Sequence, residues 1–321
     1  MSFNVTVIIP VFNAQAFIEK AVTSAYEQPE VKEIIVIEDG STDDTPKILE
    51  KLREEFKNLQ VYTHPGGINH GRAASRNLGL FKASSNYIAF LDADDYYLKD
   101  RFKNDKKLFF ETPEIDGVYN AIGAHFYRPA RGDEEKRYGL TTLKYSVPAE
   151  RLFYEMAPKG DAGWFSGDGL TVKISTFEKT GVFNEDLDVA EDADMWIRMA
   201  LAANLIGGIL EKPVSMRGIH ENNVFHLYGK QLYNRNMAKM YDSLLAWAYV
   251  KRLDKEVLSF FWNQTYNYYR YFPDKIKSNT GMNLKEWLMY GLRYPGLWKN
   301  HNYLYSLTVF KIYKKAKKRL L

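Results

Sequence analysis

The sequence predicts an α/β fold with a mostly parallel, doubly wound sheet, followed by a smaller, mainly helical region. Within the first hundred residues, apolar runs of strand length alternate with segments of helical periodicity. This βαβαβαβ order is typical of parallel strands joined by right-handed crossovers. After about Arg217 the sequence changes to helical segments rich in Tyr, Trp and Lys. We therefore expect two regions, residues 1–217 and residues 218–321.

The spacing of apolar residues predicts each element in turn. Strands are expected at residues 5–9, 33–37, 60–62 and 87–91. Helices are expected at residues 14–26, 45–56, 73–81 and 190–203. The polar stretch 128–148 reads as a loop or hairpin, and residues 163–174 read as a Gly-rich loop and strand.

Composition restricts the class of protein. The chain has 321 residues, enough for one large domain or two, and no cysteine, so it has no disulfide and no thiolate chemistry. The N-terminal sequence has no basic region before an apolar one, and no apolar run is long enough to span a bilayer. We expect a cytoplasmic protein, peripheral on the inner face of the plasma membrane if its basic end docks there.

Charge is distributed unevenly along the chain. Residues 230–321 hold 18 Lys and Arg against 5 Asp and Glu, a net +13, whereas the rest of the chain carries −9. Residues 309–320 place apolar side chains on one helical face and lysines largely on the other. Such a basic amphipathic helix can lie on an anionic membrane, and it can equally be a domain helix with a solvated lysine face.

Carboxylates directly follow the apolar run at 87–91. Asp92, Ala93, Asp94 and Asp95 stand where such a strand ends, and open α/β sheets bind ligands at that edge. Two acidic side chains one residue apart suit Mn²⁺ or Mg²⁺ in contact with a diphosphate. The alternative is an acidic turn that caps the next helix, and the spacing alone leaves both open.

Two other strand ends carry polar groups. Pro10 belongs at a strand end because it lacks a backbone donor, and the backbone beyond it can face a base. Asp39, after the second strand, can accept from a uracil N–H or from ribose hydroxyls. Helix capping is the alternative role there, but Ser41 and Asp43 can cap and leave Asp39 free.

Two helix starts complete the set of polar segments. Residues 66–77 combine glycines with a helix N-terminus, which favours phosphate, and Arg72 and Arg76 share one helix face. These arginines can pair with phosphate, with the Asp cluster or with solvent. Asp192 opens a later helix with Glu191; acids there are favoured by the helix dipole, and either can also act as a general base.

Taken together, these segments resemble family 2 glycosyltransferases with a GT-A fold, over residues 5–217. The resemblance rests on residues 8–13 (IIPVFN), 39–43 (DGSTD), 69–77 (Asn-x-Gly, then Arg-Asn), 90–95 (FLDADD) and Glu191-Asp192 followed by Trp196 and Arg198. One departure is Glu38, which stands where many relatives have Asp. Residues 128–159 match nothing in the family pattern, which leaves the acceptor open.

The resemblance implies inverting transfer of a sugar from a nucleotide-sugar donor, usually a UDP-sugar, to a saccharide or lipid-linked saccharide in surface polysaccharide or lipopolysaccharide synthesis. Asp192 would be the catalytic base with Glu191 beside it, and Asp94, Asp92 and His220 would bind Mn²⁺ or Mg²⁺. The acceptor would meet Trp164, Asp168 and Trp196. The donor would be bound by Pro10, Val11, Phe12, Asn13, Glu38, Asp39, Gly67, Asn69, Arg72, Arg76, Asp92 and Ala93.

Three competing interpretations remain. A nucleotidyltransferase can share such a sheet and metal site, but it needs basic residues near the first loop, and residues 10–16 contain none. A nucleic-acid binder acting through the basic C-terminal region would leave the acidic cluster without a purpose, so we expect no nucleic-acid partner. A non-catalytic sugar-binding relative is disfavoured by the intact Asp92, Asp94 and Asp192.

Overall fold

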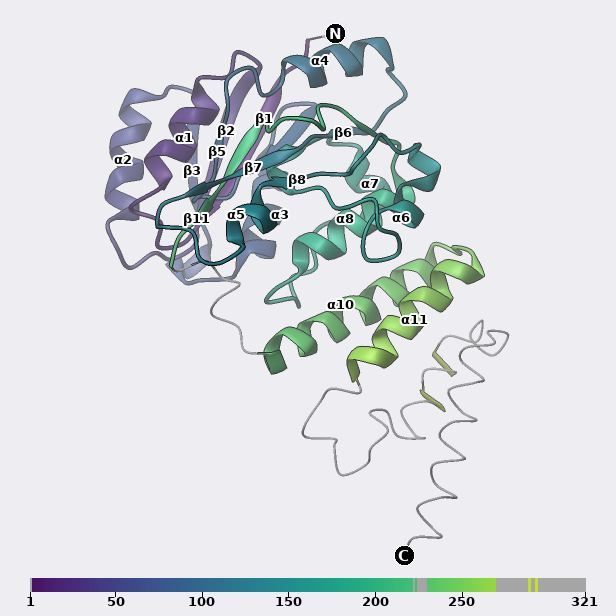
Figure 1. Cartoon of the computed structure of the whole chain (residues 1–321). Coiled ribbons are helices and arrows are strands. Elements are labelled where there is room, and N and C mark those ends of the chain that lie inside the picture. Colours follow the sequence, from purple (N-terminus) through teal and green to yellow (C-terminus); the bar gives the residue numbers. More distant parts are fainter. Residues whose placement is uncertain (1, 222, 224–229, 270–287, 290–291, 294–321) are drawn as a thin grey trace, which may run out of the picture. The chain divides into compact units, whose positions relative to one another are not determined.

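The computed structural model describes residues 2–221, 223, 230–269, 288–289 and 292–293 (Figure 1). The chain divides into two compact units, Met1–Asn223 and Val224–Leu321. The predicted boundary after Arg217 falls inside a strand of the first unit, and the compact unit extends a few residues further. The amphipathic segment 309–320, predicted to dock on a membrane, lies outside the described residues.

The first unit is built on the predicted sheet. It has seven strands in the order β10-β6-β9-β4-β1-β2-β3. The pairs β1/β2, β1/β4, β2/β3 and β6/β10 are parallel, while β9 runs antiparallel to β4 and β6. The strands are β1 (Val5–Val11), β2 (Val31–Glu38), β3 (Leu59–Thr63), β4 (Tyr87–Phe90), β6 (Gly117–Tyr119), β9 (Leu170–Lys173) and β10 (Leu205–Gly207).

Helices cover both faces of this sheet (Figure 1). They are α1 (Ile18–Tyr26), α2 (Thr45–Glu55), α3 (Arg72–Lys82), α4 (Lys103–Glu111), α5 (Glu134–Tyr138), α6 (Leu152–Glu155), α7 (Thr176–Thr180) and α8 (Glu191–Ala202). Side chains of β1 alternate between the two faces of the sheet. Val7 and Ile9 belong to the core cluster that includes α1, whereas Ile8 packs against α3 on the other face. A Cβ on Gly79 of α3 would lie 2.4 Å from Ile8, so glycine permits this close packing.

A smaller sheet adjoins the carboxyl ends of the main strands. It has the order β5-β11-β7-β8, formed by β5 (Tyr96–Tyr97), β7 (Ile122–Phe126), β8 (Leu140–Thr141) and β11 (Ser215–Ile219). The predicted loop or hairpin at 128–148 contains the short helix α5 and β8. Strand β11 pairs in parallel with β7, so the segment after it returns to the end of β4.

The first helix starts later than predicted. Residues 12–17 form a turn because side chains of the next loop take up their backbone donors: Ser41 accepts from the N–H of Asn13, and Thr45 accepts from that of Ala14, both at 2.9 Å. Asn13 adopts a positive φ of 51° and accepts from the N–H of Thr42 at 2.7 Å. The ends of β1 and β2 are thereby locked together.

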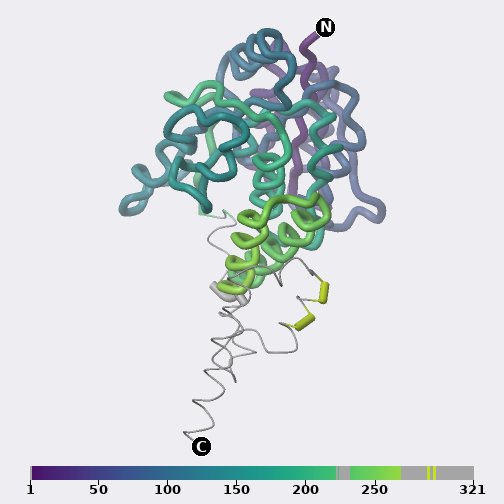
Figure 2. Tube along the Cα trace, turned by 90° about the vertical axis from the view of Figure 1, so that its right-hand side faces the viewer, coloured from purple at the N-terminus to yellow at the C-terminus, as the bar shows by residue number. Residues whose placement is uncertain are grey.

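The described part of the second unit includes two long helices, α10 (Lys230–Val250) and α11 (Lys255–Tyr269), joined by a four-residue connection and packed side by side (Figure 2). Their contact includes Tyr241, whose ring stacks on that of Tyr268 with centroids 5.7 Å apart. Among the described residues, no helix combines the length and the apolar character needed to cross a membrane.

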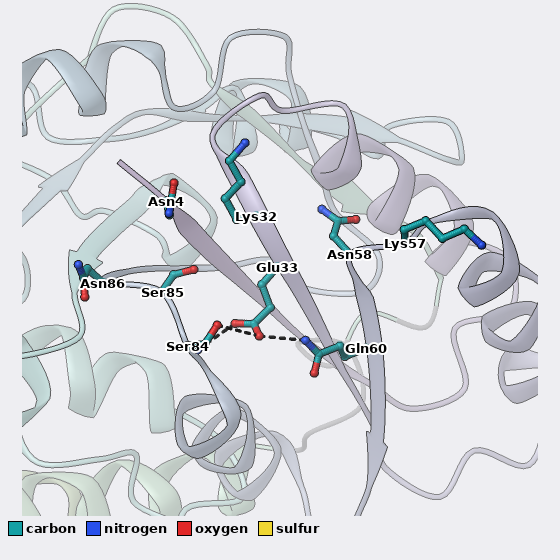
Figure 3. A pocket seen from close by; sticks show the side chains of 9 residues that line it. All are labelled: Asn4, Lys32, Glu33, Lys57, Asn58, Gln60, Ser84, Ser85 and Asn86. Carbon is teal, nitrogen blue, oxygen red and sulfur yellow. Dashed lines mark hydrogen bonds between the residues drawn. The ribbon is translucent and has the colours of Figure 1, made fainter. Parts of the chain in front are cut away.

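A polar cavity of about 510 Å³ opens at the amino end of the sheet, away from the strand ends predicted to bind ligand (Figure 3). Its centre is Glu33 of β2, 6% exposed. The carboxylate accepts from Thr6 Oγ1 at 2.6 Å, Gln60 Nε2 at 3.0 Å, and the backbone N–H and Oγ of Ser84 at 3.0 and 3.1 Å. Four protein donors satisfy this carboxylate, so Glu33 ties β1, β3 and the segment before β4 together.

Replacing this central carboxylate will destabilise the first unit. In Glu33→Ala the hydroxyl of Thr6, fully buried on β1, loses its acceptor, so we expect urea unfolding to show a loss of about 2–3 kcal/mol. The matched control is Lys32→Ala, an exposed neighbour whose loss should change stability by no more than about 0.5 kcal/mol. Equal stability of the two variants would contradict the structural role of Glu33.

Candidate active site

A buried guanidinium joins three elements of the site. Arg76 of α3 is 3% exposed and donates from Nη1 to Glu191 Oε1 at 2.8 Å and from Nη2 to Asp92 Oδ1 at 2.7 Å. Asp92 follows β4, and Glu191 is the first residue of α8. The guanidinium also lies 5.5 Å from the ring centroid of Phe183. Arg76 therefore holds the end of a strand and the start of a helix at one point.

Glu191 is occupied by arginines on both oxygens. Besides Arg76, Arg72 places Nε 3.1 Å from Oε1 and Nη2 3.2 Å from Oε2. Glu191 is 1% exposed, so it cannot reach a substrate without leaving these partners. The prediction that Glu191 shares the catalytic role is corrected: it links α8 to α3. Arg76 directs one N–H of each terminal nitrogen at Glu191 and Asp92, and its predicted contact with the donor stays a prediction.

Asp192, the next residue, is in a different position. It is partly exposed, and its Oδ1 accepts only the N–H of Ala193, at 2.7 Å, among the hydrogen bonds of the described residues. The pKa of Arg72, Arg76 and Arg217 is raised mainly by Glu191, Asp92 and Asp95 respectively, and Asp192 adds a smaller effect to each. The carboxylate of Asp192 is thus near these arginines and forms no ion pair with them.

Asp94 and His220, both predicted as cation ligands, are in direct contact, and their ligand roles stay predictions. His220 follows β11, and its Nε2 lies 2.9 Å from Asp94 Oδ2. Asn223 donates to the same oxygen at 3.2 Å, and its Oδ1 accepts the backbone N–H of His220 at 2.7 Å. The side chains of His220 and Asp94 are 15% and 30% exposed, so solvent ligands can reach both.

Two further carboxyls are buried beneath Asp92. Asp95 and Asp168 are each 3% exposed. Asp95 accepts the N–H of Gly218 at 2.8 Å, and Asp168 accepts that of Asp92 at 3.1 Å. Burial raises the pKa of Asp95 well above its ordinary value, and Asp168, hydrogen-bonded to it, adds to the effect. We interpret Asp95 as a neutral acid that donates to Asp168. The predicted acceptor role of Asp168 is corrected, because this side chain supports the end of β4.

Charge at Asp92 itself is controlled by the arginines. Burial favours the neutral acid, but Arg76 and Arg72 outweigh it and hold the pKa of Asp92 below its ordinary value. Asp92 therefore stays ionised, with 37% of its side chain exposed beside the paired oxygen.

Two sets of side chains can be compared as cation ligands. Oxygens of Asp92, Asp95 and Asp168 lie within 4.8 Å of one another, but Asp95 and Asp168 are buried and already bonded to backbone donors. Asp94 and His220 present an oxygen and an imidazole nitrogen at an accessible position. Because an imidazole suits transition metals more than Mg²⁺, the donor set of Asp94 and His220 fits Mn²⁺.

The predicted nucleoside side is shaped by Asp39. It is 3% exposed, and its two oxygens accept the N–H groups of His70 and Gly71 at 2.7 and 2.8 Å. Each oxygen keeps a second lone pair, so it can still accept from a ligand. Gly40 has a φ of +78°, and a Cβ there would lie 3.0 Å from the backbone of Asn69. Glycine is required for the Gly-rich loop to approach the end of β2.

The remaining predicted donor residues differ in exposure. Phe12 is 48% exposed, whereas Val11 and Ala93 are 2% and 8% exposed. Pro10 is buried in β1, while Gly67 and Asn69 are exposed on the Gly-rich loop. Glu38 is buried and accepts the N–H of Ser41 at 2.5 Å, so it shapes the turn after β2. Its predicted base contact is therefore corrected to a structural role.

The two predicted acceptor tryptophans lie in different environments. Trp196 of α8 is 2% exposed and packs against Phe90, Phe165 and Phe183. The prediction that it contacts the acceptor is wrong, because its helical spacing marks the core face of α8. Trp164 is partly exposed and stacks beside Phe165, with centroids 6.1 Å apart.

Sequence reasoning missed three members of the cluster. Asp95 and Asn223 take the contacts described above, and Arg217 donates to Ser166 at 3.2 Å within the field of Asp92, Asp95 and Asp168. Two of these residues lie in segments that the sequence makes recognisable. Asp95 ends the acidic run 92–95, and Arg217 begins residues 217–220, whose sequence Arg-Gly-Ile-His ends in His220. Their roles depend on the pairing of β11 with β7, which the sequence pattern does not show.

Comparison with known proteins agrees with this geometry. Residues 6–157 match the family model described as glycosyl transferase family 2. An uncharacterized glycosyltransferase of Rickettsia bellii (strain RML369-C) is 31% identical over 222 residues, which cover 69% of this chain and 30% of that protein. The poly(ribitol-phosphate) beta-N-acetylglucosaminyltransferase TarS of Staphylococcus aureus (strain MW2) is 27% identical over 215 residues, 64% of this chain and 34% of TarS.

Solved structures show the same fold. The crystal structure of S. aureus TarS 1–349 in complex with UDP-GlcNAc matches with a TM-score of 0.57 and 18% identity, covering 98% of this chain and 92% of that one. The mannosyltransferase PcManGT from Pyrobaculum calidifontis, in complex with GDP-Man and Mn²⁺, matches with a TM-score of 0.53 and 18% identity, covering 97% and 84%.

The chain belongs to family 2 of the glycosyltransferases, and its first unit has the GT-A fold. It spans about a third of the length of the curated relatives it matches.

The neutral state of Asp95 predicts a pH-dependent effect of Asp95→Asn. Because the pKa of Asp95 is raised in the folded state, its bound proton stabilises the folded protein. This contribution is complete at pH values below the pKa that Asp95 has in the unfolded chain, and it is lost as pH rises toward the raised pKa of the folded state. The side-chain amide of asparagine keeps a hydrogen-bond donor and an acceptor and does not titrate, so the variant does not lose stability as pH rises. We therefore expect Asp95→Asn to gain stability over the native chain, and to gain more at pH 8 than at pH 5, in urea unfolding with EDTA.

Asp100→Asn is the control for this variant, since Asp100 is exposed on the same segment and asparagine tolerates its positive φ of 62°. It should show no such pH-dependent gain. Loss of stability in Asp95→Asn at both pH values would mean that Asp95 is ionised in the folded protein.

Proposed function

We propose that this chain is an inverting glycosyltransferase that moves a sugar from a UDP-sugar to a hydroxyl of a saccharide or lipid-linked saccharide acceptor, with the help of a divalent cation. The observation that carries the proposal is the acidic edge after β4: Asp92 is paired with the buried Arg76, which also lies in the field of Asp192, and Asp94, two residues on, meets His220. These groups come from four separate parts of the chain. A carboxylate-rich edge held by arginines suits a nucleoside diphosphate bound through a cation.

Asp192 is the proposed general base. Its neighbour Glu191 is locked by two arginines, whereas Asp192 is partly exposed and makes no ion pair within the described residues. A carboxylate in that position takes the proton from the acceptor hydroxyl as the oxygen attacks the anomeric carbon. A single displacement of this kind inverts the anomeric configuration and needs no covalent enzyme nucleophile.

Asp94 and His220 are the proposed cation ligands, with Mn²⁺ fitting the mixed oxygen and nitrogen donors best. A cation bound there supplies positive charge that offsets the charge of the departing diphosphate. Asp92, kept ionised by Arg76, is the proposed acceptor for a ribose hydroxyl. The Mn²⁺ complex of the P. calidifontis mannosyltransferase supports the use of a cation in this fold.

Uridine is the proposed base of the donor. Asp39 follows β2 and keeps a second lone pair on each oxygen beside its two backbone donors, and Phe12, just after β1, exposes its ring. A carboxylate accepts from the N–H of uracil, and an aromatic face stacks on the base. The UDP-GlcNAc complex of TarS supports this choice, whereas the acceptor and pathway rest on the family resemblance.

Asp192→Asn will separate binding from transfer. The amide keeps the size of the side chain and cannot accept the proton, so the transfer rate should fall about 10²–10⁴-fold while the Kd for UDP stays unchanged. Asp188→Asn, an exposed change just before α8, is the matched control and should keep full activity. If transfer by the Asp192 variant persists at the native rate, another group is the base.

A thermal-shift screen of sugar nucleotides with Mn²⁺ tests the donor and the cation site together. UDP-sugars should raise the melting midpoint of the native chain more than other sugar nucleotides do, because a ligand that binds only the folded state stabilises it by mass action. In Asp94→Asn the Mn²⁺-dependent part of this shift should disappear, and in Asp100→Asn it should persist. A Mn²⁺ response unchanged in Asp94→Asn would exclude Asp94 as a ligand.

A further inference from the structure

The imidazole of His220 is packed against a ring from the first helix. Phe17, the residue before α1, stacks on His220 with centroids 4.5 Å apart and an interplanar angle of 27°. The ring of Tyr127, just after β7, lies 4.9 Å from that of Phe17. Phe17 is some two hundred residues from His220 in sequence, and it contacts the imidazole on the face of the ring, leaving Nε2 directed at Asp94.

Tyr127 is itself held in place from two sides. Lys20, one turn along α1 from Phe17, donates to the Tyr127 hydroxyl at 3.4 Å and places its ammonium 3.5 Å from the ring centroid of Tyr96. His125 of β7 packs edge-on against Tyr127, with centroids 4.6 Å apart. The ring behind Phe17 therefore has fixed neighbours on α1, β5 and β7, so Phe17 cannot easily move away from His220.

A stacked ring restricts how the imidazole turns. A histidine that binds a cation must present one nitrogen in a fixed direction, and contacts outside the ligand set commonly change cation affinity about 10–100-fold by holding that direction. The backbone N–H of His220 is held by Asn223, and its Nε2 lies 2.9 Å from Asp94 Oδ2. Phe17 adds a ring face that limits rotation of the imidazole about its side-chain bonds.

We propose that Phe17 is a positioning residue for the cation site, acting through His220 and supported by Tyr127. The inference rests on the proposed function, because it takes Asp94 and His220 as the cation ligands. It makes the first helix part of the site: α1 sets the direction of an imidazole carried by the segment after β11.

The same helix carries a second aromatic stack that serves as an internal comparison. Tyr26, the last residue of α1, stacks on Phe56 with centroids 4.2 Å apart and an interplanar angle of 25°. It lies nine residues from Phe17, about 13 Å along the helix axis. Loss of this ring removes similar packing from α1 without touching His220.

Calorimetric titration of the full chain with Mn²⁺, in saturating UDP, tests the proposal. Phe17→Ala should raise the Kd for Mn²⁺ about tenfold, Phe17→Leu should raise it by less, and Phe17→Tyr should retain the native value because it keeps the ring. Tyr26→Ala should lower the melting midpoint and leave the Kd unchanged. His220→Ala and Asp94→Asn, as ligand variants, should weaken Mn²⁺ binding most.

The outcomes separate the proposal from the function on which it rests. If the ligand variants weaken Mn²⁺ binding while Phe17→Ala and Phe17→Leu bind it like the native chain, Phe17 only packs and the inference is overturned. If His220→Ala and Asp94→Asn leave the Kd unchanged, the assigned cation site is wrong and the inference falls with it. A weaker Kd in Phe17→Leu, with the native Kd retained in Phe17→Tyr, supports the proposal even if Phe17→Ala fails to fold.

Discussion

The buried guanidinium of Arg76 holds together the polar residues after β4 and at the start of α8, and the proposed site depends on this contact. Arg76 is fixed on α3 and satisfies Asp92 after β4 and Glu191 at the start of α8. Without it, Asp92 would lose its arginine partner and Glu191 would keep only Arg72, so β4 and α8 would lose their common contact. Asp192 adjoins Glu191 in sequence and Asp94 lies two residues after Asp92, so this network sets the positions of the proposed base and cation ligand.

The same constraint explains how so many acids coexist at one edge of the sheet. Each carboxyl is stabilised in its own way: Asp92 and Glu191 by arginines, Asp95 by keeping its proton, and Asp39 by two backbone donors. Asp94 is shared with His220 and Asn223. Asp192, unlike Asp92, Glu191 and Asp94, has neither an arginine nor a histidine within ion-pair distance among the described residues, and unlike the buried Asp95 it is partly exposed, so it suits proton transfer.

Much of the fold was predictable from residues close in sequence, and much of the site was not. The length and spacing of the apolar runs in the sequence located β1, β2, β3 and β4, because buried parallel strands are continuous apolar runs. The end of the fourth strand also located Asp92 and Asp94 directly after β4, whereas their roles stay predictions. Trp196 and Glu191 were assigned to the site by residue type, whereas the partners that fix their roles, such as Phe90 and Arg76, are distant in sequence. The Asp95–Asp168 contact depends on β9 and β11 returning to β4, which local pattern does not encode.

A double-mutant cycle between Arg76 and Glu191 tests the central claim most directly. Urea unfolding of Arg76→Met, Glu191→Gln and the double variant measures how far the two side chains depend on each other. If the buried ion pair assembles the site, the single changes should be strongly non-additive, with a coupling energy of about 1.5–3 kcal/mol. Additive changes, within about 0.5 kcal/mol, would show that α3 and α8 meet without this contact and would contradict the account.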